Sequence, residues 1–431
     1  MTKPKPSDRT VALQILLQVI QNHQPLSQLL QQPGISSLTK ALCFGVIRHF
    51  IRLESVADSL VIKRPKDLSV WCCILLGLFQ LDDMNMPDYA VVQETVALLS
   101  HLHKTWAKGF VNALLRRYCR EQGAIQQALA THPEYQYNHP KWLLQTIQQA
   151  WPHEWQAILA ANDTHPPMAL RINLAKITRE AYCKQLAAAE IAYTLLPHTV
   201  SGILLDTPCA VDQIPGFIEG EISVQDGAAQ LAGPLLTLAP GLRVLDACCA
   251  PGGKLGQILE LETHLSYCLG IDIEAKRLPK VKDNCRRLHL DAAIQVGDAS
   301  HPKTWWDGVT FDRILIDAPC SATGIIRRHP DIKLLRTPDD IVHITALQKD
   351  ILNSLWPLLA PNGILVYATC SILPKENEEQ IASFIARHPD AIATITPQRW
   401  GQFTGHGWQI LPGKHAMDGF FYAQITKKRA D

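Results

Sequence analysis

Apolar residues in the first third of the chain recur every three or four positions, with polar residues between them. The pattern covers four stretches: 38–60, 70–81, 91–102 and 110–115. This spacing places apolar side chains on one face of a helix. Residues 1–135 are therefore predicted to form an all-α helical bundle.

The pattern changes after residue 135. Prolines punctuate the chain at Pro133, Pro140 and Pro166-Pro167, so helices over 142–161 are predicted to form a bridge. The runs MALRIN, AYTLL and GILL then predict strands, with a helix over 179–189. The polar, glycine-bearing segment 217–230 is expected to border a site. Residues 136–235 are therefore predicted to form a helical bridge and a small α/β unit.

The remainder, 236–431, alternates short apolar runs with helical patterns. Strands are predicted at 243–247, 267–271, 293–296, 313–316, 364–368 and 420–425, and helices at 274–288, 339–359 and 375–387. Such alternation is typical of a doubly wound, Rossmann-like α/β domain. The predicted fold class is thus multidomain: a helical bundle, a small α/β unit and a Rossmann-like domain.

Two cysteines follow predicted strands of this last domain: Cys320 in ILIDAPCSATG and Cys370 in ILVYATCS. Since the carboxyl ends of parallel strands meet at one edge of a sheet, both thiols are expected to face a single substrate there. One would be a nucleophile and the other its helper. Either cysteine alone is more often inert packing, but both lie where a strand gives way to a loop, and reactive groups gather on such loops.

The run VLDACCAPGGK ends in Gly252-Gly253 and enters a helix, whose free N–H groups favour an anion such as a carboxylate. Acidic residues end four successive predicted strands: Asp246, Asp272, Asp298 and Asp317. Each one alone is as readily a turn former or a helix cap. Together, and without a phosphate-binding loop, they indicate a nucleoside cofactor with a carboxylate tail. S-adenosylmethionine fits this description.

Composition narrows the possible partners. The 431 residues carry a formal net charge of only +1, so binding to nucleic acid requires local positive charge. Basic residues of the bundle form either a solvated face or an RNA-contacting patch: Arg48, Lys63, Arg64, Lys66, Lys104, Lys108, Arg116 and Arg117. The 12 cysteines form no C-x-x-C pair and no export signal is seen, which favours reduced thiols in the cytoplasm and no metal site. The apolar stretch 70–79 is too short to span a membrane.

These groups suit methylation of cytosine. A thiolate that adds to carbon 6 of the ring converts it into an enamine, whose carbon 5 can attack a methyl sulfonium. An acid near the ring nitrogen assists this attack, and Asp317 is placed for that role. The target must be unstacked, because carbon 6 is covered in a helix.

VLDACCAPGGK, ILIDAPCSATGIIRRHPDIK, VYATCSILPKENEEQI and DGFFYA together resemble the RNA cytosine-5 methyltransferase family. The bundle, with YAVVQETVALL and KGFVNALLRRY, resembles the NusB-like domain of the bacterial branch that acts on 16S ribosomal RNA. The resemblance implies that Cys370 is the nucleophile and that Cys320 assists product release. It implies S-adenosylmethionine contacts from Cys248, Cys249, Ala250, Pro251, Gly252, Gly253, Lys254, Asp272, Asp298 and Asp317. It also implies RNA binding by residues 1–235, and we expect a monomer.

Three residues depart from the family pattern: Cys249, Leu255 and Leu334. The loop Arg327-Arg328-His329 is predicted to bind phosphates beside the target base. Three alternatives remain: a DNA cytosine-5 methyltransferase with Cys320 as nucleophile, a non-catalytic RNA-binding or assembly factor, and an enzyme acting on transfer RNA. The Thr369-Cys370 motif and the helical domain weigh against the first, and the intact glycines, acids and cysteines against the second.

Overall fold

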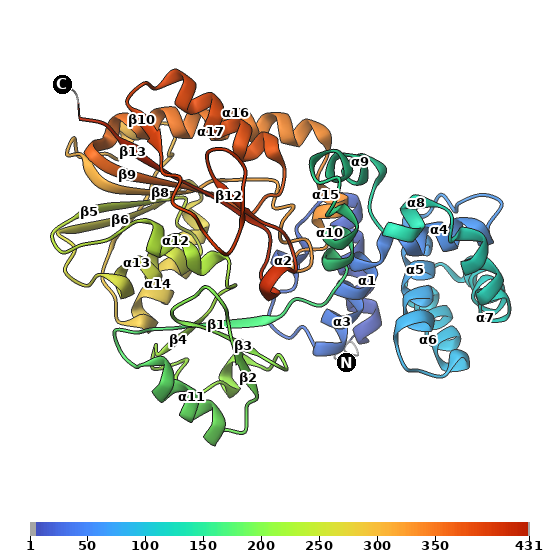
Figure 1. The fold of residues 1–431 in the computed structure, drawn as a ribbon. Coiled ribbons are helices and arrows are strands. Elements are labelled where there is room, and N and C mark those ends of the chain that lie inside the picture. The colour runs from blue at the N-terminus through green and yellow to red at the C-terminus, as the bar shows by residue number, and fades with distance from the viewer. Residues whose placement is uncertain (1–5, 430–431) are drawn as a thin grey trace. The chain divides into compact units, whose positions relative to one another are not determined.

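The chain up to Asn162 is helical, as its apolar spacing predicts (Figure 1). The computed structural model describes residues 6–429. The helices are α1 (Asp8–Asn22), α2 (Leu26–Leu29), α3 (Ser37–Arg48), α4 (Phe50–Leu60), α5 (Leu68–Asp83), α6 (Asp88–His101), α7 (Lys108–Leu129), α8 (Pro133–Tyr137), α9 (Lys141–Ala150) and α10 (Trp155–Asn162). The stretch 38–60 is two helices, because the chain turns at His49 between α3 and α4.

The core of this helical unit is built around α5. Every residue of α5 from Val70 to Gln80 is buried, so this helix is apolar on all sides, as a central helix is. Side-chain caps fix where its neighbours begin: Ser7 accepts from Thr10 N–H at α1, and Ser36 accepts from Thr39 N–H at α3. Such caps each stabilise a helix by about 1 kcal/mol.

The helical unit also contains a segment from far along the chain. Residues Ile326–Arg336, with the short helix α15 (Ile332–Leu335), belong to this unit rather than to the unit formed by Pro166–Ile325 and the chain from Thr337. Leu334, one of the departures from the family pattern, packs against the helical core. The sequence did not predict this crossing of the chain.

The same segment corrects one prediction. Arg327 is only 4% exposed, and its carbonyl accepts a hydrogen bond from Arg48 Nη1 at 2.9 Å. A guanidinium buried in this way does not present itself to phosphates, so Arg327 is not the phosphate-binding residue that the sequence suggested. Arg48, itself 3% exposed, likewise lies in the interior and not in a surface patch.

The small α/β unit forms a four-stranded antiparallel sheet in the order β2-β3-β1-β4. Its elements are β1 (Met168–Ile172), α11 (Arg179–Ala188), β2 (Tyr193–Leu195), β3 (Gly202–Leu205) and β4 (Ile222–Val224). β4 lies inside the polar segment 217–230 and was not predicted. The buried side chain of Arg171 in β1 donates to Glu260 at 2.8 and 2.9 Å and to Gly253 O at 2.7 Å, which ties this sheet to α13 (Gly253–Leu261).

The largest sheet has the order β11-β12-β13-β9-β8-β5-β6-β7, and β10 pairs with β13. Its strands are β5 (Arg243–Ala247), β6 (Tyr267–Asp272), β7 (Ala293–Val296), β8 (Phe311–Asp317), β9 (Leu359–Thr369), β10 (Ala391–Ala393), β11 (Gln402–Phe403), β12 (Trp408–Ile410) and β13 (Phe420–Lys427). From β9 to β7 all neighbours are parallel, whereas β13 is antiparallel to β9. The predicted multidomain α/β fold class is confirmed.

Helices and short 3₁₀ turns connect these strands. The helices are α12 (Ala232–Leu235), α13, α14 (Leu278–Leu288), α16 (Pro338–Leu355) and α17 (Glu378–Arg387). The 3₁₀ turns, including one in the helical unit, are η1 (Thr105–Ala107), η2 (Val211–Gln213), η3 (Ala229–Leu231), η4 (Ala275–Arg277), η5 (Pro302–Thr304), η6 (Trp356–Leu358), η7 (Pro374–Glu376) and η8 (Lys414–Ala416). The helix predicted over 339–359 ends at Leu355. Within residues 6–429, no helix has the length and apolar character needed to cross a membrane.

Candidate active site

The predicted site residues gather where the strand order reverses. β5 pairs with β6 on one side and with β8 on the other, so the loops that follow these strands diverge and leave a crevice. The loop 248–254 follows β5, Asp272 ends β6 and Asp317 ends β8. The fold therefore brings the glycine loop and two of the acids to one edge of the sheet.

The two cysteines lie in contact at this edge. Cys370 directly follows β9, Cys320 follows β8 by three residues, and their sulfur atoms are 3.3 Å apart. Backbone hydrogen bonds hold the loops: Gly324 N–H donates to Cys370 O at 2.9 Å, and Gly419 N–H donates to Gly324 O at 2.8 Å. A Cβ at Gly324 would collide with the carbonyl of Gly419, which explains the need for glycine here.

The environment keeps Cys320 protonated. Its hydrogen bond with Cys370, together with burial, raises the pKa of Cys320 well above that of a free thiol. A protonated thiol thus lies beside the sulfur of Cys370. Two sulfur atoms in contact suit a pair in which one sulfur attacks and the other handles a proton.

Lys254 and Asp317 form an ion pair next to the sulfur atoms. Lys254 Nζ lies 2.6 Å from Asp317 Oδ2 and 5.2 Å from the centre of the Phe420 ring. Burial is the largest single influence and disfavours the Lys254 ammonium, but the charge and the hydrogen bond of Asp317, with smaller contributions from neighbouring groups, together outweigh it, so the pKa of Lys254 is raised. The pair offers both a hydrogen-bond donor and an acceptor to a ring bound beside the cysteines.

Asp246 shows that the site fits a ligand with hydrogen-bond donors. The side chain is 0% exposed, and neither of its oxygens finds a hydrogen-bond partner among the described residues. Burial, and then the charge of Asp317, raise the pKa of Asp246 well above the usual range of a carboxyl. A buried carboxyl without partners is rare in proteins. The ammonium and hydroxyl groups of S-adenosylmethionine are donors of the required kind.

The glycine loop has the backbone geometry that the sequence predicts. Gly252 has φ +99°, a conformation that L side chains rarely adopt, and no side chain caps α13. The N–H groups of the first turn of α13 are therefore available to a carboxylate. Burial raises the pKa of both Cys248 and Cys249, so these thiols shape the loop and are not reactive. Cys249 and Leu255, two departures from the family pattern, are buried apolar residues here.

Asp272 is buried, whereas Asp298 is half-buried. Asp272 is 2% exposed and accepts from Ala250 N–H at 3.2 Å and from Glu274 N–H at 2.9 Å, with Arg277 Nη1 3.2 Å away. Asp298 follows β7 and accepts from Ser300 N–H at 2.8 Å. Arg277 also donates to Ala250 O at 2.7 Å, yet no sequence motif singled it out.

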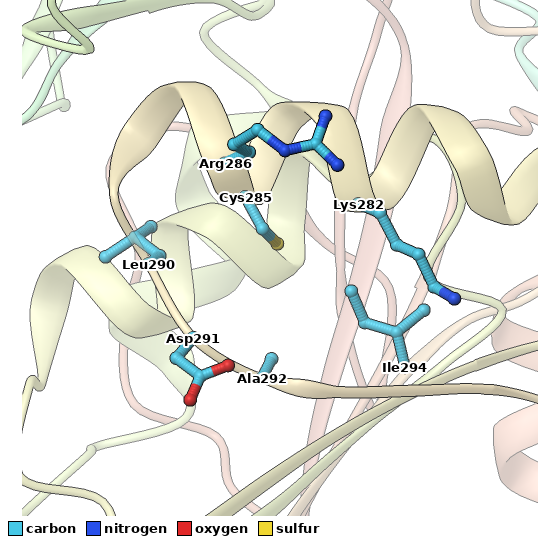
Figure 2. Close-up of a pocket in the computed structure, with 7 residues that line it drawn as sticks. All are labelled: Lys282, Cys285, Arg286, Leu290, Asp291, Ala292 and Ile294. Atoms are coloured by element: carbon cyan, nitrogen blue, oxygen red, sulfur yellow. The ribbon is translucent and has the colours of Figure 1, made fainter.

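Two cavities lie away from this edge. The first, of about 300 Å³, is lined by Lys282, Cys285, Arg286, Leu290, Asp291, Ala292 and Ile294 (Figure 2). It adjoins the start of β7, whereas the cysteines follow the ends of their strands. The second, of about 540 Å³, is lined in part by Gln230, Gln257, Leu261 and Trp400. Neither cavity is lined by the two cysteines, the glycine loop or the strand-end acids, but Gln230 of the second belongs to the segment 217–230 that was expected to border a site. No group of side chains suited to a metal ion is found within residues 6–429.

Comparison with known proteins agrees with this architecture. Three family descriptions match: the NusB family over residues 6–120, the ferredoxin-like domain of RsmF/B-like methyltransferases over 139–212, and 16S rRNA methyltransferase RsmB/F over 234–426. Ribosomal RNA small subunit methyltransferase B of Pseudomonas putida is 47% identical over 392 residues, 90% of each chain. That of Vibrio cholerae is 43% identical over 429 residues, 97% of each chain. A solved structure, a methyltransferase homologue from Pyrococcus horikoshii, is 28% identical with a TM-score of 0.60, covering 68% of this chain and 97% of its own.

Proposed function

The chain belongs to the 16S rRNA methyltransferase family that includes ribosomal RNA small subunit methyltransferase B, and from this membership we propose that it methylates carbon 5 of a cytosine in 16S rRNA. The methyl donor in this proposal is S-adenosylmethionine, whose sulfonium supplies the methyl group. The reaction passes through a covalent bond between a cysteine and the RNA, and it takes place in the cytoplasm.

The observation that carries this proposal is the contact between the two cysteine sulfur atoms beside Lys254 and Asp317. The thiolate of Cys370 adds to carbon 6, and the electron pair moves to the ring, where the Lys254–Asp317 pair hydrogen-bonds the nitrogen that gains negative charge. Carbon 5 is then nucleophilic and takes the methyl group.

Release reverses the addition. The proton on carbon 5 leaves to a base, the bond between carbon 6 and Cys370 breaks, and the ring regains its double bond. Cys320 lies 3.3 Å from the departing sulfur and is assigned to this stage. The glycine loop, Asp272 and Asp298 bind the cofactor in this proposal. The helical unit and the small α/β unit bind RNA.

Two variants test the division of roles. Cys370→Ser prevents the covalent bond from forming, whereas Cys320→Ser lets it form and persist, and both abolish turnover. After incubation with 16S rRNA and cofactor, Cys320→Ser is expected to give a denaturant-resistant protein–RNA band, and Cys370→Ser none. The reverse result would assign attack to Cys320, as in the DNA-type mechanism. No band with either variant would remove the covalent step.

A further inference from the structure

A buried carboxylate is hydrogen-bonded to the two loops that carry the cysteines. Glu376 is the last residue of η7, and its side chain is 0% exposed. Burial of an ionised carboxylate costs much free energy unless donors surround it. The partners of Glu376 therefore indicate what keeps a carboxylate in this position.

Glu376 binds the residue that follows each cysteine. Oε2 accepts from Ser321 N–H at 2.7 Å, and Oε1 accepts from the hydroxyl of Ser321 and, at 2.6 Å, from the hydroxyl of Ser371. Ser321 follows Cys320, and Ser371 follows Cys370. One carboxylate thus joins the two loops that carry the sulfur atoms.

The surroundings make this connection rigid. Gln348 Nε2 donates to Glu376 Oε2 at 3.2 Å and to Pro319 O at 2.9 Å. The hydroxyl of Thr323 lies 3.1 Å from that of Ser371. Gln348, Thr323 and both serines are 0% exposed. These donors are neutral, and hydrogen bonds from neutral donors to a charged acceptor are about twice as strong as bonds between neutral groups.

We propose that Glu376 is a positioning residue: by binding the serine after each cysteine, it holds Cys320 and Cys370 in contact. The proposal rests on the cysteine roles given above. A reacting group displaced by about 1 Å can cost about 100-fold in rate, so a link between the loops matters although Glu376 itself is fully buried.

The charge of Glu376 has a separate effect. The hydrogen bond to Cys370 and burial raise the pKa of Cys320 most, and repulsion from the Glu376 carboxylate adds to them. Glu376 therefore contributes both a connection between the loops and a charge that favours the protonated form of Cys320. The two contributions can be separated by substitution.

Three variants make this separation. Glu376→Gln keeps an oxygen for Ser321 N–H and turns its own N–H groups toward the serine hydroxyl oxygens, so the connection stays and the charge is lost. Glu376→Ala loses both. Glu379→Gln is the matched control, because Glu379 lies in the same motif and is exposed.

The first measurement uses the full chain without RNA or cofactor. Diamide takes two electrons and two protons from a pair of neighbouring thiols, and peptide mass spectrometry follows the Cys320–Cys370 disulfide that results. We expect Glu376→Gln and Glu379→Gln to form it at least as fast as the unsubstituted protein, and Glu376→Ala to form it at least about tenfold more slowly. Equal rates in all four proteins would overturn the proposal. This result does not depend on the proposed function.

The second measurement is turnover on 16S rRNA. Glu376→Ala should lower kcat about 100-fold with KM for RNA and affinity for cofactor unchanged, whereas Glu376→Gln should keep kcat within about tenfold and shift the pH profile. Loss of cofactor affinity together with kcat would show a collapsed site and refute a positioning role. If Glu376→Ala fails to fold, Ser371→Ala removes one donor of the connection and is expected to slow disulfide formation. A rate equal to that of the unsubstituted protein would then overturn the proposal.

Discussion

Lys254 and Lys333 both pair with a carboxylate, but Lys254 is half-buried at the candidate active site, whereas Lys333 is buried inside the helical unit. The ammonium of Lys254 has one hydrogen-bond partner, Asp317 at 2.6 Å. That of Lys333 has three: Arg48 O at 2.7 Å, Asp163 Oδ1 at 2.9 Å and Asn138 O at 3.0 Å. The pKa of Lys254 is raised, because Asp317 and neighbouring groups together outweigh the effect of burial. Burial lowers the pKa of Lys333 to about 8.

The two lysines differ in how many of their N–H donors have a partner. An ammonium has three N–H donors, so Lys333 is fully satisfied, whereas Lys254 keeps donors for a ligand. Lys333 fixes α15 among the helices, and this segment begins six residues after Cys320 in the sequence. The helical unit therefore anchors the chain that leaves the Cys320 loop.

The largest expected effect comes from Lys333→Met. This variant removes the cation paired with Asp163 and the ammonium donor to Arg48 O and Asn138 O, and it should lower the free energy of unfolding by about 3–5 kcal/mol. Lys254→Met should lower it by about 1 kcal/mol or less, because Asp317 is partly exposed and remains hydrated. Urea denaturation monitored by circular dichroism gives both values. Similar losses of unfolding free energy in the two variants would show that both lysines stabilise the fold to the same extent.

Short sequence motifs predicted where the candidate site residues lie in the fold. The loop 248–254 and the acidic residues directly follow or end parallel strands. The predicted alternation of strands and helices was therefore enough to place them at one edge of the sheet. Glu376 lies in the motif VYATCSILPKENEEQI, but the motif alone indicates no role for it. Only the folded chain shows that its carboxylate binds Ser321, 55 residues away. The hydrophobic periodicity of 326–336 could not predict that this segment belongs to the helical unit, because its contacts with Arg48 and Asn138 join residues far apart in the sequence.

Very short elements were missed for a different reason. β4, β10, β11 and β12 contain two or three residues each, too few for an alternating pattern to be recognised. Pairing with longer neighbours, such as β13 for β10 and β12, makes them strands.

A smaller effect is expected at the cofactor edge. Asp272→Ala removes a charged acceptor and should weaken S-adenosylmethionine binding by about 1.5–3 kcal/mol. Calorimetry measures the affinity. Asp283→Ala, on the exposed surface of α14, is the control and should bind as the unsubstituted protein does. An unchanged affinity for Asp272→Ala would mean that Asp272 only supports the backbone of Ala250 and Glu274.

The smallest effect is expected on the surface of the helical unit. Arg116 and Arg117 are exposed on α7, where Arg117 also pairs with Glu121 at 2.9 Å. Arg48 is buried, and Arg64 and Lys104 form ion pairs elsewhere in the unit. If the two arginines contact phosphates, the double variant Arg116→Ala/Arg117→Ala should reduce the slope of log affinity for 16S rRNA against log salt by about one to two. Arg387→Ala on α17, an exposed cation of the other unit, is the control.

Point substitutions are required for this test because deletion of the helices would also remove the partners of Lys333. A truncated chain would then lose affinity through misfolding, whatever the role of the surface arginines. An unchanged salt slope in the double variant, with cofactor affinity intact, would identify Arg116 and Arg117 as a solvated face. A reduced slope with intact cofactor binding would show that the helical unit binds the RNA backbone, and that it does so with side chains other than those that hold Lys333.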